Sequence, residues 1–263
     1  MENKTSLARD GNVFSAKEME HIIIFRFKES PLLQATDLRA KAEVLDYLNL
    51  VSRSDSIKVV VIMGSPQEME PKEYVEFYRQ VSEPDQIAIQ RMHNAVNQVI
   101  LGITELNKIV IHADSRKFIS LFLNVSLACD YRIVSDSCVF HNLHLELGLV
   151  PKGGEAFFLS KMLGLNKACE ILLSAEDISA QEALRLGIVN KVVPSGEFEE
   201  AVLKIAQRFA QKPARSLSGV KRLLNYSKKD LGDYLEFENE ELFRILMSSD
   251  FRKKVGEYTA GNF

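Results

Sequence analysis

The sequence has few cysteines, and none of them is placed as in a disulfide framework. Cys129, Cys138 and Cys169 are the three cysteines of the chain, and all lie in apolar stretches. An odd number of cysteines in such surroundings indicates small buried hydrophobic residues rather than paired half-cystines. The pattern is typical of a protein of a reducing compartment, and we expect a cytoplasmic location.

The sequence also lacks a large excess of charge of one sign, and it lacks long hydrophobic runs. The chain has 33 basic and 36 acidic residues, well mixed, with a net charge of -3, so no basic surface suggests nucleic acid. No stretch reaches the roughly 18 to 20 apolar residues of a membrane helix, and we expect no membrane partner.

Residues 1–18 are polar, without the apolar core of a signal peptide, and are predicted to form a tail. No nucleophile elbow or Walker phosphate loop is present, so the sequence gives no support to covalent catalysis or phosphoryl transfer.

What the sequence does contain is an alternation of strand and helix patterns. Hydrophobic residues make up 46% of the 263 residues, which is enough for a substantial core. The alternation of the two patterns predicts an α/β fold. The predicted strands cover residues 22–27, 58–63, 108–112 and 131–140, and the predicted helices cover 37–51, 74–81, 86–106 and the apolar stretch 118–129.

Beyond Pro151 the patterns are mainly helical. Ser179 and Glu182 form a capping box that starts one helix, and Gly187 is expected to end it. Three longer helices are predicted at the C-terminal end, over residues 198–211, 214–226 and 231–257.

Two motifs in the second half of the chain carry a family resemblance. The first is Ala128-Cys-Asp130-Tyr-Arg-Ile-Val, followed by Phe140, Leu147-Gly-Leu-Val-Pro151 and Gly153-Gly154; the second runs from Leu172-Leu-Ser-Ala-Glu-Asp to Leu186-Gly-Ile-Val-Asn-Lys-Val-Val-Pro194. Together they resemble the crotonase (enoyl-CoA hydratase/isomerase) superfamily. The resemblance implies a spiral of β-β-α turns with two roughly perpendicular sheets over residues 19–195. It also implies a helical region over 196–263 that assembles trimers, often paired into hexamers.

The resemblance further implies an acyl-CoA thioester as substrate, with coenzyme A as part of that substrate and no separate cofactor. Two backbone N–H groups hold the thioester oxygen in this family, because preorganised dipoles stabilise the charge that develops there. The matching positions here are Leu121, within Ser120-Leu121-Phe122, and less clearly Ser65, since the usual alanine-glycine-aspartate loop is absent. Leu121 and Phe122 add bulk where the family has glycine, and simple packing into the core is an alternative interpretation for both.

By the same resemblance, the positions of the two catalytic glutamates of hydration are occupied by Asn124 and His144. Asn124 cannot take up a proton near neutral pH, so water addition by the ordinary route is not expected. His144 has a reference pKa near 6.5 and could act as an acid or base, or it could be a structural histidine. His112, Asp114 and Ser115 lie near the expected pocket, where they could contribute chemistry or, for the last two, cap a helix.

The spacing His141-x-x-His144-x-Glu146 invites a metal interpretation. It lies where a strand gives way to a loop, so the two histidines are not expected to share a face, and no metal is predicted.

Two functions remain open from the sequence. One is an acyl-CoA enzyme of altered mechanism, an isomerase, decarboxylase or thioester hydrolase, with His144 as proton carrier and Asn124 as orienting group. The alternative is a catalytically inactive acyl-thioester-binding or assembly subunit. An unmodified hydratase is disfavoured.

A homotrimer or a dimer of trimers is expected. Its signal in the sequence is an apolar stripe formed by Leu242, Phe243, Ile245 and Leu246.

Overall fold

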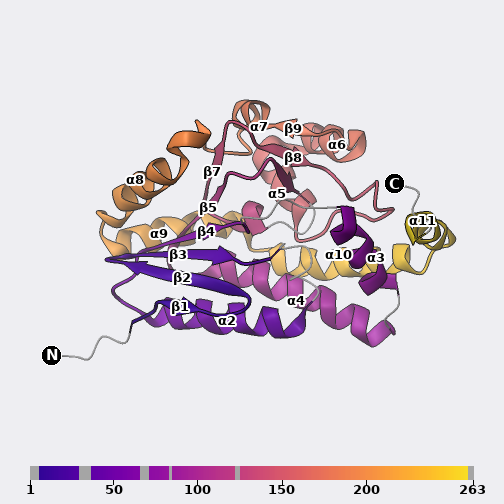
Figure 1. Ribbon diagram of the computed structural model, residues 1–263, viewed down its shortest axis with the longest axis horizontal. Coiled ribbons are helices and arrows are strands. Elements are labelled where there is room, and N and C mark those ends of the chain that lie inside the picture. Colours follow the sequence, from indigo (N-terminus) through magenta and orange to yellow (C-terminus); the bar gives the residue numbers. More distant parts are fainter. Residues whose placement is uncertain (1–5, 30–36, 66–70, 83–84, 122–124, 260–263) are drawn as a thin grey trace.

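Two β-sheets form the centre of the chain in a computed structural model that describes residues 6–29, 37–65, 71–82, 85–121 and 125–259 (Figure 1). The larger sheet has the order β1-β2-β3-β4-β5-β7-β10 and the smaller one the order β6-β8-β9. The strands of the larger sheet are β1 (Arg9–Asp10), β2 (Phe14–Met19), β3 (Ile22–Phe27), β4 (Val59–Met63), β5 (Ile109–Asp114), β7 (Tyr131–Ser135) and β10 (Lys191–Val193). Those of the smaller sheet are β6 (Phe118–Ser120), β8 (Val139–His141) and β9 (Ile178–Ser179).

Helices surround these sheets in a mixed α/β arrangement (Figure 1). Those before β5 are α2 (Leu38–Arg53), α3 (Pro71–Ser82) and α4 (Gln86–Glu105). The middle of the chain contributes the short 3-10 helix η1 (Val125–Ala128), α5 (Glu155–Leu163), α6 (Leu165–Ser174) and α7 (Ala180–Leu186). After β10 come η2 (Ser195–Glu197), α8 (Phe198–Ala210), α9 (Ala214–Asn225), η3 (Tyr226–Lys228), α10 (Leu231–Leu246) and α11 (Ser249–Thr259).

The central strands β3, β4 and β5 are parallel and buried on both faces. Alternate residues of a strand point to opposite faces, so each strand contributes to two clusters. Val60 and Val110 join the main core with α2 and α4, whereas Val59, Val61 and Ile111 pack with the apolar face of α8. Helices on both faces explain why the strands are almost continuously hydrophobic, as the sequence predicted.

The N-terminal prediction is wrong for part of its range. Residues 14–19 form β2, an antiparallel partner of β3 with Phe14 opposite Phe27, and do not belong to a tail. Phe14 and Ala16 face the core, where the Phe14 and Phe25 rings stack with centroids 4.3 Å apart. The period-two pattern Phe14-Ser-Ala16 was the signal for this strand.

The predicted helix over residues 118–129 is also wrong. Its first residues form β6, which pairs in parallel with β8, and its last ones form η1; residues 122–124 lie outside the described part. The predicted strand over 131–140 is two strands in different sheets, β7 and β8. Apolar content was equally compatible with a buried helix and a buried strand, and tertiary pairing decided between them.

The helical second half follows the sequence closely. The Ser179 side chain accepts a hydrogen bond from the Glu182 N–H at 3.2 Å, and Gly187 ends α7 in the left-handed conformation, which confirms both caps. The predicted helix over 231–257 is two helices, because the Ser248 hydroxyl accepts a hydrogen bond from the Phe251 N–H and so starts α11. Cys129 and Cys138 are buried as expected, but Cys169 is exposed on α6.

A buried polar cluster joins the loop before α5 to α10. The Lys152 ammonium donates to Glu238 Oε2 at 3.0 Å and also to the Asn97 side chain of α4. The Glu238 carboxylate accepts the N–H groups of Gly153 and Gly154 at 2.9 and 3.0 Å. Burial lowers the pKa of Lys152 and raises that of Glu238, and each partner opposes the shift of the other. This cluster anchors the family motif at residues 151–154 to the C-terminal helices.

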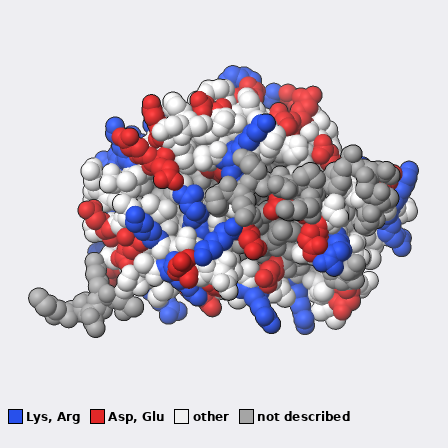
Figure 2. Space-filling view, in the orientation of Figure 1, with Lys and Arg blue, Asp and Glu red and all other residues white. Residues whose placement is uncertain are grey.

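Charges on the visible face are mixed. In Figure 2, basic and acidic side chains alternate over the described surface without a large area of one sign. Within the described ranges, no helix combines the length and the apolarity that crossing a bilayer requires.

Candidate functional site

Polar side chains gather where the parallel strands β4 and β5 end. Met63 and Ala113 are paired across the two strands, so the residues that follow them lie at one edge of the sheet. Gly64 and Ser65 come directly after β4, and Asp114 is the last residue of β5. The sequence placed Ser65 and Asp114 near one pocket, and the register brings their strand ends together.

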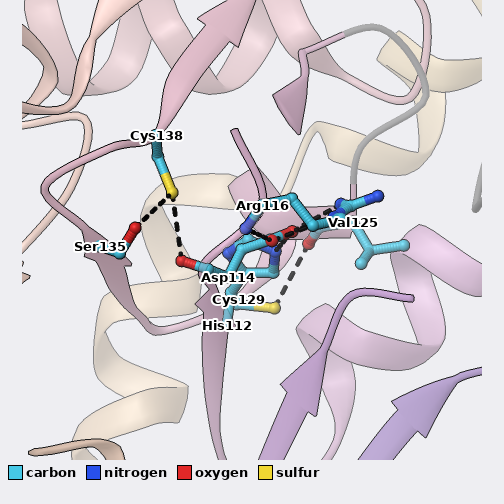
Figure 3. Close-up of polar contacts among 7 residues, drawn as sticks. All are labelled: His112, Asp114, Arg116, Val125, Cys129, Ser135 and Cys138. Carbon is cyan, nitrogen blue, oxygen red and sulfur yellow. Dashed lines mark hydrogen bonds and ion pairs between the residues drawn. The ribbon is translucent and has the colours of Figure 1, made fainter. Parts of the chain in front are cut away.

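Asp114 is held by Arg116, a residue that the sequence analysis did not single out. The buried Asp114 carboxylate accepts hydrogen bonds from Arg116 Nε at 3.0 Å, from Nη2 at 2.5 Å and from the backbone N–H at 3.0 Å. Figure 3 shows the guanidinium lying along this carboxylate, while Cys138 donates to the Asp114 carbonyl at 3.4 Å. Asp114 therefore caps a turn before β6 rather than a helix, which corrects the capping prediction.

Gly64 makes room for this ion pair. A Cβ atom at Gly64 would lie 2.6 Å from Asp114 Oδ2 and 2.8 Å from Arg116 Nε, closer than side-chain carbons come to other atoms. The buried carboxylate leaves little freedom to move aside. A glycine is required at the end of β4 because the charged pair of β5 packs directly against its backbone.

His112 lies beneath the pair and is uncharged at neutral pH. Its Nε2 is 3.8 Å from Asp114 Oδ2, and Nδ1 has no hydrogen-bond partner among the described residues. Burial lowers the pKa of His112 to about 4, although the Asp114 carboxylate opposes that shift. His112 is therefore packed next to an ion pair. This position indicates no direct role in proton transfer.

The two thioester-binding candidates are both engaged within the protein. Ser65 is buried, and its hydroxyl donates to the Lys28 carbonyl at 3.3 Å. The Leu121 N–H donates to the His141 carbonyl at 3.0 Å, and the Leu121 side chain is packed in the core. In this conformation the Leu121 N–H is part of the β6–β8 ladder and is not directed at a ligand. The core-packing interpretation of Leu121 holds, whereas Phe122 lies outside the described residues.

Of the two catalytic candidates, only His144 falls in the described part of the chain; Asn124 does not. His144 follows β8 and is 1% exposed, with Nδ1 unpaired among the described residues. Burial lowers its pKa to about 4, and a hydrogen bond with the Leu172 backbone opposes the shift. His144 is therefore a neutral imidazole at cellular pH, able to accept a proton but not to titrate near neutrality.

His141 differs from His144 in both surroundings and partner. Its Nδ1 forms a hydrogen bond with Asp177 Oδ1, and its side chain is 28% exposed. His141 is partly exposed whereas His144 is buried, and no group of three or more possible metal ligands occurs within the described ranges. Asp177 was missed because it lies 36 residues from His141 and has no local signal of its own.

With this geometry in place, comparison with known proteins defines the class. The family model for enoyl-CoA hydratase/isomerase matches residues 18–259. The chain is 24% identical over 221 residues to trans-2-decenoyl-[acyl-carrier-protein] isomerase of Streptococcus mutans, covering 82% of this chain and 83% of that protein. It is 29% identical to a probable enoyl-CoA hydratase of Mycobacterium tuberculosis, covering 78% and 75% of the two chains.

A solved structure agrees with the fold. The crystal structure of an enoyl-CoA hydratase from Mycobacterium avium subsp. paratuberculosis superposes with a TM-score of 0.79 at 21% identity, covering 95% of this chain and 96% of that one. The crotonase fold predicted from the sequence is confirmed. This chain belongs to the enoyl-CoA hydratase/isomerase family.

Proposed function

We propose that this protein binds an acyl thioester, removes a proton from one carbon of the acyl chain and returns it to another. The result is a change in position of a C=C double bond conjugated with the thioester carbonyl. The observation that carries the proposal is His144, a neutral buried imidazole whose Nδ1 has no partner among the described residues. The resemblance matches its position to the family's second glutamate. A single base that removes a proton, forms an enolate and returns the proton to another carbon is sufficient for isomerisation.

Ordinary hydration requires more than one such base. It needs one group to activate water and another to deliver a proton, and the sequence has Asn124 where the first carboxylate would be. An amide can orient a carbonyl or a water but cannot take its proton. The similarity to an isomerase of trans-2-decenoyl thioesters supports the same preference, with coenzyme A or a carrier protein as the thiol.

Solvent exchange provides the test of this proposal. Incubated with trans-2-decenoyl-CoA or decanoyl-CoA in deuterated water, the wild type should incorporate deuterium, as measured by mass spectrometry. His144→Ala should lower the exchange rate by about 10²- to 10⁴-fold, the usual contribution of general acid/base catalysis. The matched control is His21→Ala, because His21 is an exposed histidine whose side chain bonds the Ser56 carbonyl. Exchange that is unchanged in His144→Ala would refute the role of His144.

The pH profile sharpens the same test. The free base accepts the proton, and burial lowers the pKa of His144 to about 4. Activity should therefore stay level from about pH 8 to pH 5 and fall as the pH drops through about 4, rather than titrate near neutrality as the sequence alone suggested.

One observation favours the second candidate, an inactive acyl-thioester-binding subunit. The Leu121 N–H is already bonded to His141, so one expected oxyanion donor is engaged. Calorimetry separates the two functions: decanoyl-CoA that binds without any exchange would support the binding subunit.

We also propose a homotrimer. The apolar stripe expected at Leu242 and Leu246 faces the protein's own core, so that argument from the sequence fails. Exposed apolar side chains instead lie on α9 and η3: Val220, Leu223, Leu224 and Tyr226 are 56 to 78% exposed. Exposed apolar side chains that gather in one region are typical of an interaction surface. Light scattering at micromolar concentration should give three times the 29.7 kDa of one chain, and a monomer would contradict the proposal.

A further inference from the structure

One row of residues crosses the smaller sheet on its outer face. Ser120 of β6 is the ladder partner of His141 of β8. Phe140 of β8 is paired with Ile178 of β9, so Asp177 comes next to His141 in the same antiparallel register. The row therefore reads Ser120, His141, Asp177 across three neighbouring segments.

The side chains of this row point away from the core. The preceding row, Ile119, Phe140 and Ile178, is 1 to 6% exposed and belongs to the main core. Successive residues of a strand face opposite sides, so Ser120 and His141 share the other face, on strands about 4.8 Å apart. The rings of Phe118 and His141, both on that face, have centroids 5.9 Å apart, which agrees with this arrangement.

Asp177 fixes the orientation of the His141 ring. The hydrogen bond joins Asp177 Oδ1 to His141 Nδ1, so Nε2 is the ring nitrogen that this bond leaves for proton transfer. A carboxylate bonded to Nδ1 selects the tautomer with its proton there and stabilises the imidazolium that forms when Nε2 takes a proton. A serine within hydrogen-bond reach of such an imidazole is the arrangement of an activated nucleophile, and strand pairing places Ser120 beside His141.

The row also lies beside the proposed thioester site. Ser120 directly precedes Leu121, whose position matches the family's oxyanion donor. The pKa of Tyr74 on α3 is raised chiefly by burial, then by the Glu146 carboxylate, and to a smaller extent by the charge of Asp177. Asp177 therefore lies near α3. The row thus includes the last residue of β6 and, at its Asp177 end, lies near α3.

We propose that Ser120, His141 and Asp177 form a nucleophilic triad that transfers the acyl group of a bound thioester to Ser120 and then to water. This activity extends the proposed function, on which it rests for the nature of the substrate. The chain has no nucleophile elbow, and here the nucleophile is positioned by strand pairing instead. That is why the sequence motifs gave no support to covalent catalysis.

The chemistry balances without any further reactant except water. Ser120 Oγ attacks the thioester carbon while His141 Nε2 takes its proton; the C–S bond then breaks, and His141 returns the proton to the departing thiolate. A water molecule next gives its proton to Nε2 and attacks the acyl ester. The C–Oγ bond breaks, Ser120 recovers the proton, and the free acid and thiol are the products.

The test uses two probes on the whole chain. An alkyl fluorophosphonate should form an adduct that peptide mass spectrometry locates on Ser120, and decanoyl-CoA should release free thiol, measured with a disulfide reagent. Ser120→Ala should abolish both signals. His141→Gln and Asp177→Asn should slow both by about 10³- to 10⁴-fold, since each removes a member of the relay that activates the serine.

Matched controls are Ser216→Ala and His21→Gln, a serine and a histidine distant in sequence from this row. Thermal melts of every variant show whether it folds. If Ser120→Ala does not fold, Ser120→Cys is used in its place. No adduct on Ser120 in the wild type, or thiol release that survives in folded Ser120→Ala, would overturn the triad.

The outcomes separate the triad from the proton-transfer function. Deuterium exchange without an adduct or thiol release would leave the proposed function standing and remove the triad. An adduct on Ser120 with thiol release but no deuterium exchange would support the triad and remove the proton transfer at His144.

Discussion

Two polar regions of this molecule each pair a basic side chain with a carboxylate, but in different surroundings. At the start of α5, Lys152 and Glu238 are fully enclosed and satisfied by each other and by backbone N–H groups. On the outer face of the smaller sheet, His141 and Asp177 are 28% and 43% exposed. The first region fixes the position of a loop, whereas the second can be reached by water and by a ligand.

The difference in burial changes which groups can carry a charge. Glu155 lies beside the first region, and burial raises its pKa to about 8, so this carboxyl is mostly protonated at neutral pH. His93, on the other side, has its pKa lowered to about 3 by burial and by the Lys152 charge. Desolvation disfavours the charged form of each group, whereas Lys152 and Glu238 stabilise the charge of one another.

Breaking the buried pair should produce the largest effect on stability. Glu238→Gln removes the counter-charge of Lys152, which is then buried as an unpaired ammonium. We expect a loss of about 3 to 5 kcal/mol in the free energy of unfolding, the usual cost of breaking a buried pair. Urea denaturation followed by circular dichroism measures it.

The matched control for this variant is Glu241→Gln, on the same helix, where Glu241 pairs with Arg244 at the surface. It should change stability by no more than about 1 kcal/mol. Equal losses in the two variants would show that the cluster at α5 does not anchor the loop.

Breaking the half-exposed pair should have the smallest effect on stability. Asp177→Asn keeps an acceptor oxygen for His141 and removes only a charge that solvent already screens. We expect a change in unfolding free energy below about 1 kcal/mol, measured by the same denaturation experiment. A loss comparable to that of Glu238→Gln would mean that the row on the smaller sheet is structural, and the contrast between the two regions would disappear.

Local patterns predicted most of the secondary structure. The strand over residues 22–27 and the helix over 37–51 were recovered as β3 and α2, because each is a long, strongly periodic segment. The N-cap at Ser179 was recovered because its hydrogen bond joins residues three positions apart, although the Glu182 side chain pairs with Arg185 and not with the Ser179 N–H. Such features depend on neighbours in sequence, which the sequence shows directly.

The candidate site was predicted less completely. His144 was correctly placed after a strand, but its pKa was not, because desolvation depends on residues packed around it from elsewhere in the chain. Arg116 was missed although it lies two residues from Asp114. Nothing in the sequence shows that the backbone after β5 bends so that the Arg116 side chain contacts the Asp114 carboxylate.

By itself, the sequence determined the alternation of strands and helices and the family. The tertiary structure alone decided that residues 118–120 pair as a strand with β8, and thereby that Ser120, His141 and Asp177 fall into one row. The physical reason is that strand register depends on hydrogen bonds between segments far apart in the chain. A shift of one residue would turn every side chain of such a row to the other face.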